Sequence, residues 1–188
     1  MNLDSKTRIL DSAQRLVGSR GYSGFSFHDI KDEVGITTAS IHYHFPTKAN
    51  LGVALLRRYR DGLRTALGRL ARSPGSFREK IGGVVAIYEE VRVQNGTCFG
   101  SALGGEYGVL PDEVRTELRA FIDDAVNGLK KIIEPSQKSG GLRSDIPAET
   151  LARTWYALLQ GSLTASRASD PSFLTQASET LLKLSHTP

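Results

Sequence analysis

Cysteine is almost absent from this sequence. Cys98 is the single cysteine among 188 residues, which excludes an internal disulfide and a cysteine-rich zinc site. The four histidines do not follow the spacing of a metal site. We therefore predict that the protein binds no metal and needs no cofactor.

Long apolar runs are also missing. No stretch approaches the roughly 20 apolar residues of a membrane-spanning helix, and Met1-Asn2-Leu3-Asp4 does not begin a signal peptide. We expect a cytoplasmic protein that makes no contact with a membrane.

Motifs that identify enzymes are lacking as well. The chain has no phosphate-binding glycine loop, no serine-nucleophile motif and no pair of acids at catalytic spacing. Gly104-Gly105 and Gly140-Gly141 are more typical of turns or close helix contacts. We predict that the protein is not an enzyme and has no catalytic residue.

Positive charge is concentrated in the first third of the chain. Residues 1–72 hold 12 Lys or Arg against 6 Asp or Glu, whereas residues 73–188 hold 12 against 14. This asymmetry predicts that a polyanion binds the N-terminal third. Six of the arginines fall in a helix expected over 48–72. The favoured interpretation of this run is a solvated face that pairs with neighbouring acids, and the other is extra phosphate contact.

Two short helices separated by a tight turn are predicted in the first fifty residues. Apolar residues spaced three and four apart share one face of a helix over 27–34, which Ser26 caps at its N-terminus. Gly35 then supplies the left-handed conformation that a sharp turn needs. Thr37 caps a second helix over 38–44, closed by a proline. This is the pattern of a helix-turn-helix, whose second helix enters the DNA major groove.

The end of this segment carries the most specific motif. Residues 41–51 read Ile-His-Tyr-His-Phe-Pro-Thr-Lys-Ala-Asn-Leu, similar to the signature Tyr-x-His-Phe-x-x-Lys-x-x-Leu. With the apolar and small residues over 8–30, the N-terminal region resembles the TetR family of bacterial one-component transcriptional regulators. The departures are His42, where the family more often has tyrosine, and Ala39, where glycine is common.

Seven residues are candidates for DNA contact. Hydroxyls and an imidazole on the second helix can donate or accept at base edges and phosphates. The resemblance implies that Tyr43 and Lys48 contact phosphates. Ser26 could offer its hydroxyl to the phosphate backbone on the opposite side of the DNA groove. The candidates are Ser26, Thr37, Thr38, Ser40, His42, Tyr43 and Lys48. We expect the partner to be double-stranded DNA with a palindromic operator.

The remaining sequence predicts helices and no strand. Apolar periodicity indicates a helix over 4–20 and a connecting helix over 48–72, followed by a linker at Ser73-Pro74-Gly75-Ser76. Further helices are expected over 77–94, 97–108, 111–134, 148–168 and 171–184. We predict an all-α fold of about nine helices, with a three-helix DNA-binding domain over 1–50 and a helical effector-binding and dimerisation domain over 73–188.

The last two helices are candidates for a dimer interface. Helix 148–168 is apolar over much of its circumference, which fits either a buried core helix or one shared with another chain. The resemblance implies that helices 148–168 and 171–184 form a four-helix bundle with a second copy. A two-fold dimer is also what recognition of two half-sites requires.

An effector site between the helices of the second domain is implied by the resemblance. Its candidate residues are largely aromatic or apolar, and each also fits a plain core position. They are Tyr88, Cys98, Phe99, Leu103, Tyr107, Phe121, Trp155, Tyr156 and Leu159. We expect a small apolar or weakly polar effector, with Glu106 as the obvious charge nearby.

Cys98 has two interpretations. It is a small buried hydrophobe, as free cysteines often are, or it is a thiol that senses electrophiles, which requires access and a lowered pKa. A helix N-terminus near Thr97 would favour the thiolate. The surrounding sequence resembles a TetR subgroup with a cysteine at this place.

We predict a sequence-specific DNA-binding transcriptional regulator, a repressor released from its operator by a small-molecule or electrophile effector. Release would follow if the effector stabilises a conformation whose recognition helices no longer have the spacing of about 34 to 36 Å that two half-sites need. The alternative is a DNA-binding regulator without a ligand of its own, controlled by a protein partner.

Overall fold

The protein is all-helical. The structure, a computed structural model, describes residues 4–95 and 97–185, which form nine α-helices, a short 3-10 helix and no strand. The predicted fold class is therefore confirmed. The helices are α1 (Ser5–Arg20), α2 (Phe27–Val34), α3 (Thr38–His44), α4 (Lys48–Arg72), α5 (Phe77–Asn95), α6 (Phe99–Gly105), α7 (Asp112–Lys138), α8 (Ala148–Ala168) and α9 (Phe173–Ser185), with the 3-10 helix η1 at Tyr107–Val109.

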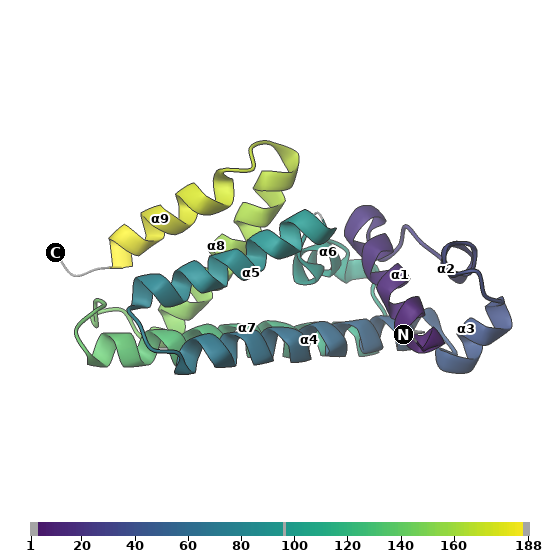
Figure 1. Cartoon of the computed structure of the whole chain (residues 1–188), viewed down its shortest axis with the longest axis horizontal. Helices are drawn as coiled ribbons and strands as arrows, with labels where there is room; N and C mark the ends of the chain where they lie inside the picture. The colour runs from purple at the N-terminus through teal and green to yellow at the C-terminus, as the bar shows by residue number, and fades with distance from the viewer. Residues whose placement is uncertain (1–3, 96, 186–188) are drawn as a thin grey trace.

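The helices form an elongated molecule with α2 and α3 at one end (Figure 1). Helix α4 leads from α3 along much of the length of the molecule, packed lengthwise against α7. Helices α5 and α8 lie above this pair, and α9 packs against α8 and α5 on the side away from α3. Because α4 begins directly after α3 and continues alongside α7, a change in the tilt of α4 relative to α7 would move α3.

In the N-terminal unit, which comprises α1, α2 and α3, capping residues stabilise the starts of α2 and α3 where the sequence predicts them. The Ser26 hydroxyl oxygen accepts a hydrogen bond from the His28 amide, and Asp29 completes a capping box. Gly35 has a φ of 70°, the left-handed conformation that favours glycine. The Thr37 hydroxyl oxygen accepts from the Ser40 amide at 3.1 Å. These local bonds fix the turn between α2 and α3.

Three predicted helices differ from the structure by more than one residue in their boundaries. The helix expected over 171–184 runs from Phe173 to Ser185. The helix expected over 97–108 begins only at Phe99, with Cys98 as its N-cap residue, and is interrupted before η1. The helix expected to end at residue 134 continues to Lys138. Pro135 is tolerated because it removes only one bond of the helical ladder, near the helix end, and the Ser139 amide still donates to the Pro135 carbonyl at 3.1 Å.

A single apolar core runs through the molecule. Buried side chains of α1, α2 and α3 join those of the later helices in one continuous cluster. Phe121 of α7 and Trp155 of α8 are fully buried at its centre. Within residues 4–95 and 97–185, no helix has both the length and the apolar content that crossing a bilayer requires.

Candidate functional site

The candidates for DNA contact lie on and around α3. Ile41 and Phe45 are buried and anchor the helix to the rest of the N-terminal unit. The opposite face carries Thr38, His42 and Tyr43, all exposed, and Tyr43 has 85% of its surface accessible. The short helix therefore presents a hydroxyl, an imidazole and a phenol to solvent.

Some of the candidate polar groups already have internal partners. The Ser26 hydroxyl donates to Asp29 Oδ2 at 2.7 Å, and hydrogen bonds from the Ser26 hydroxyl and amide lower the pKa of Asp29 to about 2. The Thr37 and Ser40 hydroxyl oxygens lie 2.8 Å apart. Ser26 and Thr37 thus act as helix caps, and Ser40 is bonded to the Thr37 hydroxyl. The remaining lone pairs of these hydroxyls, and the hydroxyl hydrogen that is not used between Thr37 and Ser40, are what they can offer to DNA.

Lys48 points into the protein rather than toward solvent. Its ammonium donates to the Phe25 carbonyl at 2.5 Å and lies 4.8 Å and 4.4 Å from the ring centroids of Tyr22 and Phe25. Burial lowers the pKa of this lysine. In this arrangement the charge joins the loop before α2 to the start of α4, and a direct phosphate contact by Lys48 stays a prediction.

The arginines of α4 mostly pair with acids of the same molecule. Arg57 and Arg60 contact the buried Glu117 carboxylate at 3.1 Å and 2.9 Å, and Arg60 also contacts Asp124 at 2.5 Å. Residues 1–50 alone hold only six Lys or Arg against five Asp or Glu. Two of the six arginines thus pair with acids of α7, while Arg58 pairs with Asp11 and Arg64 with Asp61. This pairing agrees with the favoured interpretation of the arginine run.

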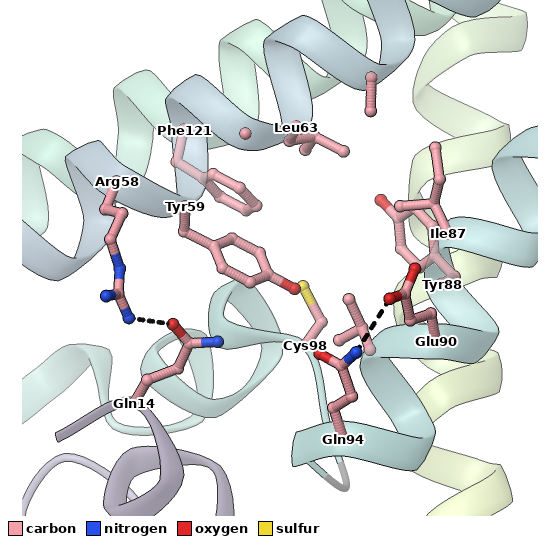
Figure 2. A pocket seen from close by; sticks show the side chains of 13 residues that line it. Gln14, Arg58, Tyr59, Leu63, Ile87, Tyr88, Glu90, Gln94, Cys98 and Phe121 are labelled. Carbon is pink, nitrogen blue, oxygen red and sulfur yellow. Dashed lines mark hydrogen bonds between the residues drawn. The ribbon is translucent and has the colours of Figure 1, made fainter. Parts of the chain in front are cut away.

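A cavity of about 250 Å³ opens beside α4 (Figure 2). Its wall is mostly apolar, and its buried end holds the phenol rings of Tyr59 and Tyr88, the Cys98 thiol and the Phe121 ring. Its polar rim comes from α1, α4 and α5. The rim residues are Gln14, Arg58, Glu90 and Gln94. Figure 2 shows Arg58 bonded to Gln14 on one side of the opening and Gln94 bonded to Glu90 on the other.

This lining contains part of the predicted effector set. Of the nine candidates, Tyr88, Cys98 and Phe121 line the cavity. Trp155 and Leu159 are fully buried in the core, and Tyr107 lies on η1 under the guanidinium groups of Arg115 and Arg119. The candidates outside the lining are Phe99, Leu103, Tyr107, Trp155, Tyr156 and Leu159.

Sequence reasoning missed most of the cavity. Tyr59 and Leu63 lie on the inner stripe of α4, so their spacing gave a usable signal. The rim had no such signal, because Gln14 belongs to α1, far away in the chain. Glu106, expected as the charge near the effector, is not part of the lining.

The Cys98 thiol is buried but reaches the cavity. Only 3% of the residue is exposed, and Gln160 Nε2 lies 3.4 Å from the sulfur. Burial raises the pKa of the Cys98 thiol, and the hydrogen bonds from Gln160 and from the amides at the start of α6 do not compensate for it. The structure therefore lacks the lowered pKa that a sensing thiolate requires, while the place of the sulfur in the cavity wall leaves access from inside.

Two family models match the chain. The model described as "Bacterial regulatory proteins, tetR family" matches residues 9–55, which contain α2, α3 and the start of α4. The model described as "Tetracyclin repressor-like, C-terminal domain" matches residues 71–181, more than half of the protein. The chain belongs to the TetR family. Members of this family are DNA-binding transcriptional regulators, not enzymes.

Relatives within the TetR family match almost the whole chain. The transcriptional repressor DhaR of Mycobacterium sp. (strain GP1) is 26% identical over 94% of this chain and 92% of its own length. A solved TetR-family regulator from Agrobacterium tumefaciens superposes with a TM-score of 0.91 at 27% identity, covering 97% of each chain. One from Legionella pneumophila gives 0.88 at 28% identity, covering 98% of this chain and 100% of its own.

In this TetR-family protein, two arginine side chains tie α1 to the later helices. Arg58 of α4 donates to Asp11 at 2.6 Å. Arg167 of α8 donates to the Gly18 and Ser19 carbonyls at the end of α1, at 3.0 Å and 3.2 Å. These carbonyls carry the negative end of the helix dipole, so a cation stabilises them. Helix α1 is therefore held both at its middle and at its end.

Glu106, immediately after α6, holds the loop that follows α1. Its carboxylate accepts from the Tyr22 amide at 2.6 Å and the Ser23 amide at 2.8 Å. Partial burial alone would raise the pKa of Glu106, but the hydrogen bonds from Ser23 and Tyr22 outweigh it and lower that pKa. With Cys98 at one end of α6 and Glu106 at the other, this short helix joins the cavity wall to the N-terminal unit.

Alkylation of Cys98 by iodoacetamide should be slow near neutral pH. Because burial raises the thiol pKa, less thiolate is present at pH 7 than in a free thiol, and the rate should still be rising steeply at pH 9. We expect a rate at pH 7 at least about tenfold below that of glutathione. The same protein unfolded in urea is the control, and a native rate above that of glutathione would restore the sensing interpretation.

Replacing Lys48 by methionine should destabilise the protein without changing its charge contacts with DNA. The variant loses a charge-assisted hydrogen bond and two cation–π contacts, a cost of about 1 to 3 kcal/mol measured by urea unfolding. The salt dependence of DNA binding should keep its slope. A slope smaller by about one would instead show a phosphate contact. Lys31→Met on α2, whose ammonium lies 3.6 Å from the Asp32 carboxylate, is the matched loss of charge.

Proposed function

We propose that this TetR-family protein is a repressor that acts in the cytoplasm and binds a palindromic operator as a homodimer. In this proposal residues 1–50 form the DNA-binding domain, residues 73–188 form the effector-binding and dimerisation domain, and α4 connects them. A small, mostly apolar effector entering the cavity releases the DNA. The observation that supports this most directly is that Gln14 and Arg58, which join α1 to α4, also form the rim of the cavity.

The DNA side of the proposal uses the exposed face of α3. Thr38 and His42 lie four residues apart on this helix and are proposed to face base edges, with Thr37 and Ser40 beside them. Tyr43, at the exposed corner of α3, would bond a phosphate. Ser26, at the start of α2, would meet the opposite backbone. Lys48 is left out of the proposed direct contacts, because its ammonium is held inside.

The proposed dimer surface is the outer face of α8 and α9. An apolar groove runs between these two helices, lined by Leu158, Phe173, Gln176, Ala177, Thr180, Leu181 and Leu184. Phe173 and Leu184 are 46% and 64% exposed in the single chain. Beside the groove, α8 exposes Ala157 and Gly161, small residues that let helices approach closely. A second copy of the same pair would cover both features in a two-fold contact.

The cavity favours a compact effector. Its volume of about 250 Å³ is below the roughly 300 Å³ at which pockets for drug-sized ligands begin. An apolar body would lie among Tyr59, Leu63 and Phe121, with one polar group near the rim. A small electrophile would reach the Cys98 sulfur from the same space, even though burial keeps that thiol protonated.

Release would follow from competition at the rim. The effector can favour a second conformation only by binding it more tightly than the DNA-binding one. Arg58 contacts Asp11 and Gln14 of α1 in the present arrangement. An effector whose polar group engages Arg58 weakens these contacts and lets α1 shift, with α2 and α3 following.

Two measurements test this function. Selection from a random double-stranded DNA library should enrich a palindrome, whose binding is then followed by fluorescence anisotropy. The neutral probe N-phenyl-1-naphthylamine, which fluoresces in apolar surroundings, should bind the cavity and be displaced by the compounds that release DNA. Tight operator binding with no probe binding and no release would favour control by a protein partner. Absence of any enriched sequence would contradict operator recognition.

A further inference from the structure

His42 is held in one orientation by two neighbours. Its Nδ1 atom lies 3.1 Å from the Pro46 carbonyl oxygen. Its ring stands edge-on to the Phe27 ring, with centroids 5.0 Å apart and an interplanar angle of 71°. The side chain is nevertheless exposed on α3. These contacts reach it from α2 and from the turn before α4, so the ring is fixed before any DNA arrives.

The Pro46 contact decides which ring nitrogen carries the proton. A carbonyl oxygen can only accept, so Nδ1 must be the donor in this hydrogen bond. A neutral imidazole has a single N–H, which leaves Nε2 with a free lone pair. Among the interactions of residues 4–95 and 97–185, none engages Nε2. Neutral His42, an exposed residue of α3, can therefore accept a hydrogen bond at Nε2.

The major groove offers few groups that such an acceptor can bond. Guanine presents N7 and O6, which accept, and thymine presents O4, which accepts, beside a methyl group. Only the N6 amine of adenine and the N4 amine of cytosine donate there. An oxygen or N7 opposite Nε2 would place two lone pairs against each other. The fixed tautomer thus selects between two classes of base.

We propose that His42 determines operator specificity by accepting a hydrogen bond from the exocyclic amine of an adenine or cytosine in each half-site. This inference rests on the proposed docking of α3 in the major groove. Tyrosine, which is common at this position in the TetR family, carries a hydroxyl that both donates and accepts hydrogen bonds. With His42 tied to Pro46, this chain instead demands a donor from the DNA.

The test compares the parent with His42→Phe, which keeps an aromatic ring beside Phe27 and removes both nitrogens. Library selection is run at pH 8 for both proteins. The parent should require adenine or cytosine at one symmetric position of each half-site, and the variant should lose this requirement there alone. On the selected operator, affinity should fall about tenfold for each half-site.

Deleting the amine from the DNA separates base reading from a structural role. The selected adenine is replaced by purine, or the selected cytosine by pyrimidin-2-one, so that only the amine is lost. The parent should bind this operator about tenfold more weakly per half-site, whereas His42→Phe should bind both operators equally. A purely structural His42 would give equal losses in both proteins and would overturn the proposal.

His28→Phe is the matched control, since His28 is exposed on α2 and pairs with Asp32 at 3.4 Å instead of lying on α3. Its selected sequence should match that of the parent. If the parent selects a palindrome that His42→Phe selects identically, the inference on His42 fails and operator recognition stands. If the parent selects no sequence, operator recognition itself fails, and the inference falls with it.

Discussion

Gly161→Arg is expected to convert the protein into a monomer and to remove most of its affinity for the operator. Gly161 is exposed on α8, and a Cβ added there meets no atom within 4 Å. The single chain therefore has room for the new side chain, and a helix gains about 1 kcal/mol when glycine is replaced by a better helix former. In the proposed dimer, however, two arginines would be forced into the closest part of the helix contact.

The loss of affinity follows from the two half-sites. In a dimer the second recognition helix binds at a high effective concentration, which raises affinity by roughly 10² to 10⁴ over one half-site alone. A monomer loses this factor while its α3 stays intact. Sedimentation equilibrium should report a single chain, circular dichroism an unchanged helix content, and fluorescence anisotropy the reduced operator binding.

Gly82→Arg is the matched control for this prediction. Gly82 is also an exposed helical glycine, and a Cβ added to it likewise meets nothing within 4 Å, but it lies on α5. The Gly82→Arg substitution makes the same change in charge and helix propensity on another helix. The dimer and its affinity for the operator should therefore be unchanged. A Gly161→Arg protein that still sediments as a dimer would place the interface away from the middle of α8.

The helix-turn-helix could be predicted from sequence because its determinants are local. Ser26, Gly35 and Thr37 each act within three or four residues of their own position, through caps and one left-handed turn. The apolar faces of α1, α4 and α8 were likewise predicted from the periodicity of apolar residues alone. Those helices begin and end within one residue of the prediction. Local chemistry sets the elements of this fold.

The cavity could not be predicted to the same degree because its rim is assembled from three distant helices. Gln14, Arg58 and Glu90 come together only after α1, α4 and α5 have packed. The aromatic residues that the sequence offered for the site were chosen by type, and type does not distinguish the fully buried Trp155 from Tyr59 at the cavity. Lys48 illustrates the same limit, since the motif gave its position but not the direction of its side chain.

The contacts around α1 explain why cavity and DNA face should respond to one another. Arg58, Glu106 and Arg167 reach α1 or the loop after it from α4, the end of α6 and α8. The cavity is bounded by α4 and by the start of α6, while α8 carries the proposed dimer surface. A ligand that moves either wall therefore acts on a contact that positions the N-terminal unit.

Gly62→Phe is expected to produce a repressor that binds its operator normally and no longer responds to its effector. Gly62 lies on α4 in the cavity lining, and a Cβ added there meets nothing within 4 Å. The new side chain can thus enter the lining of the cavity at its Cβ without a clash, and its ring is expected to fill the space beside Tyr59 and Leu63. Because it leaves Arg58, Glu106 and Arg167 in place, operator affinity should stay within about twofold of the parent, a change of less than roughly 0.5 kcal/mol.

The effector response should be lost because the ring and the ligand compete for one volume. Binding of N-phenyl-1-naphthylamine should weaken by at least about tenfold, since overlap with a side chain costs several times RT, and release of the operator should weaken in parallel. Gly82→Phe, which adds the same ring on an open face of α5, should bind the probe as the parent does. If Gly62→Phe is released at the parent's effector concentration, the effector binds elsewhere, and the contacts of α1 must be disturbed from the end of α6 or from α8 instead.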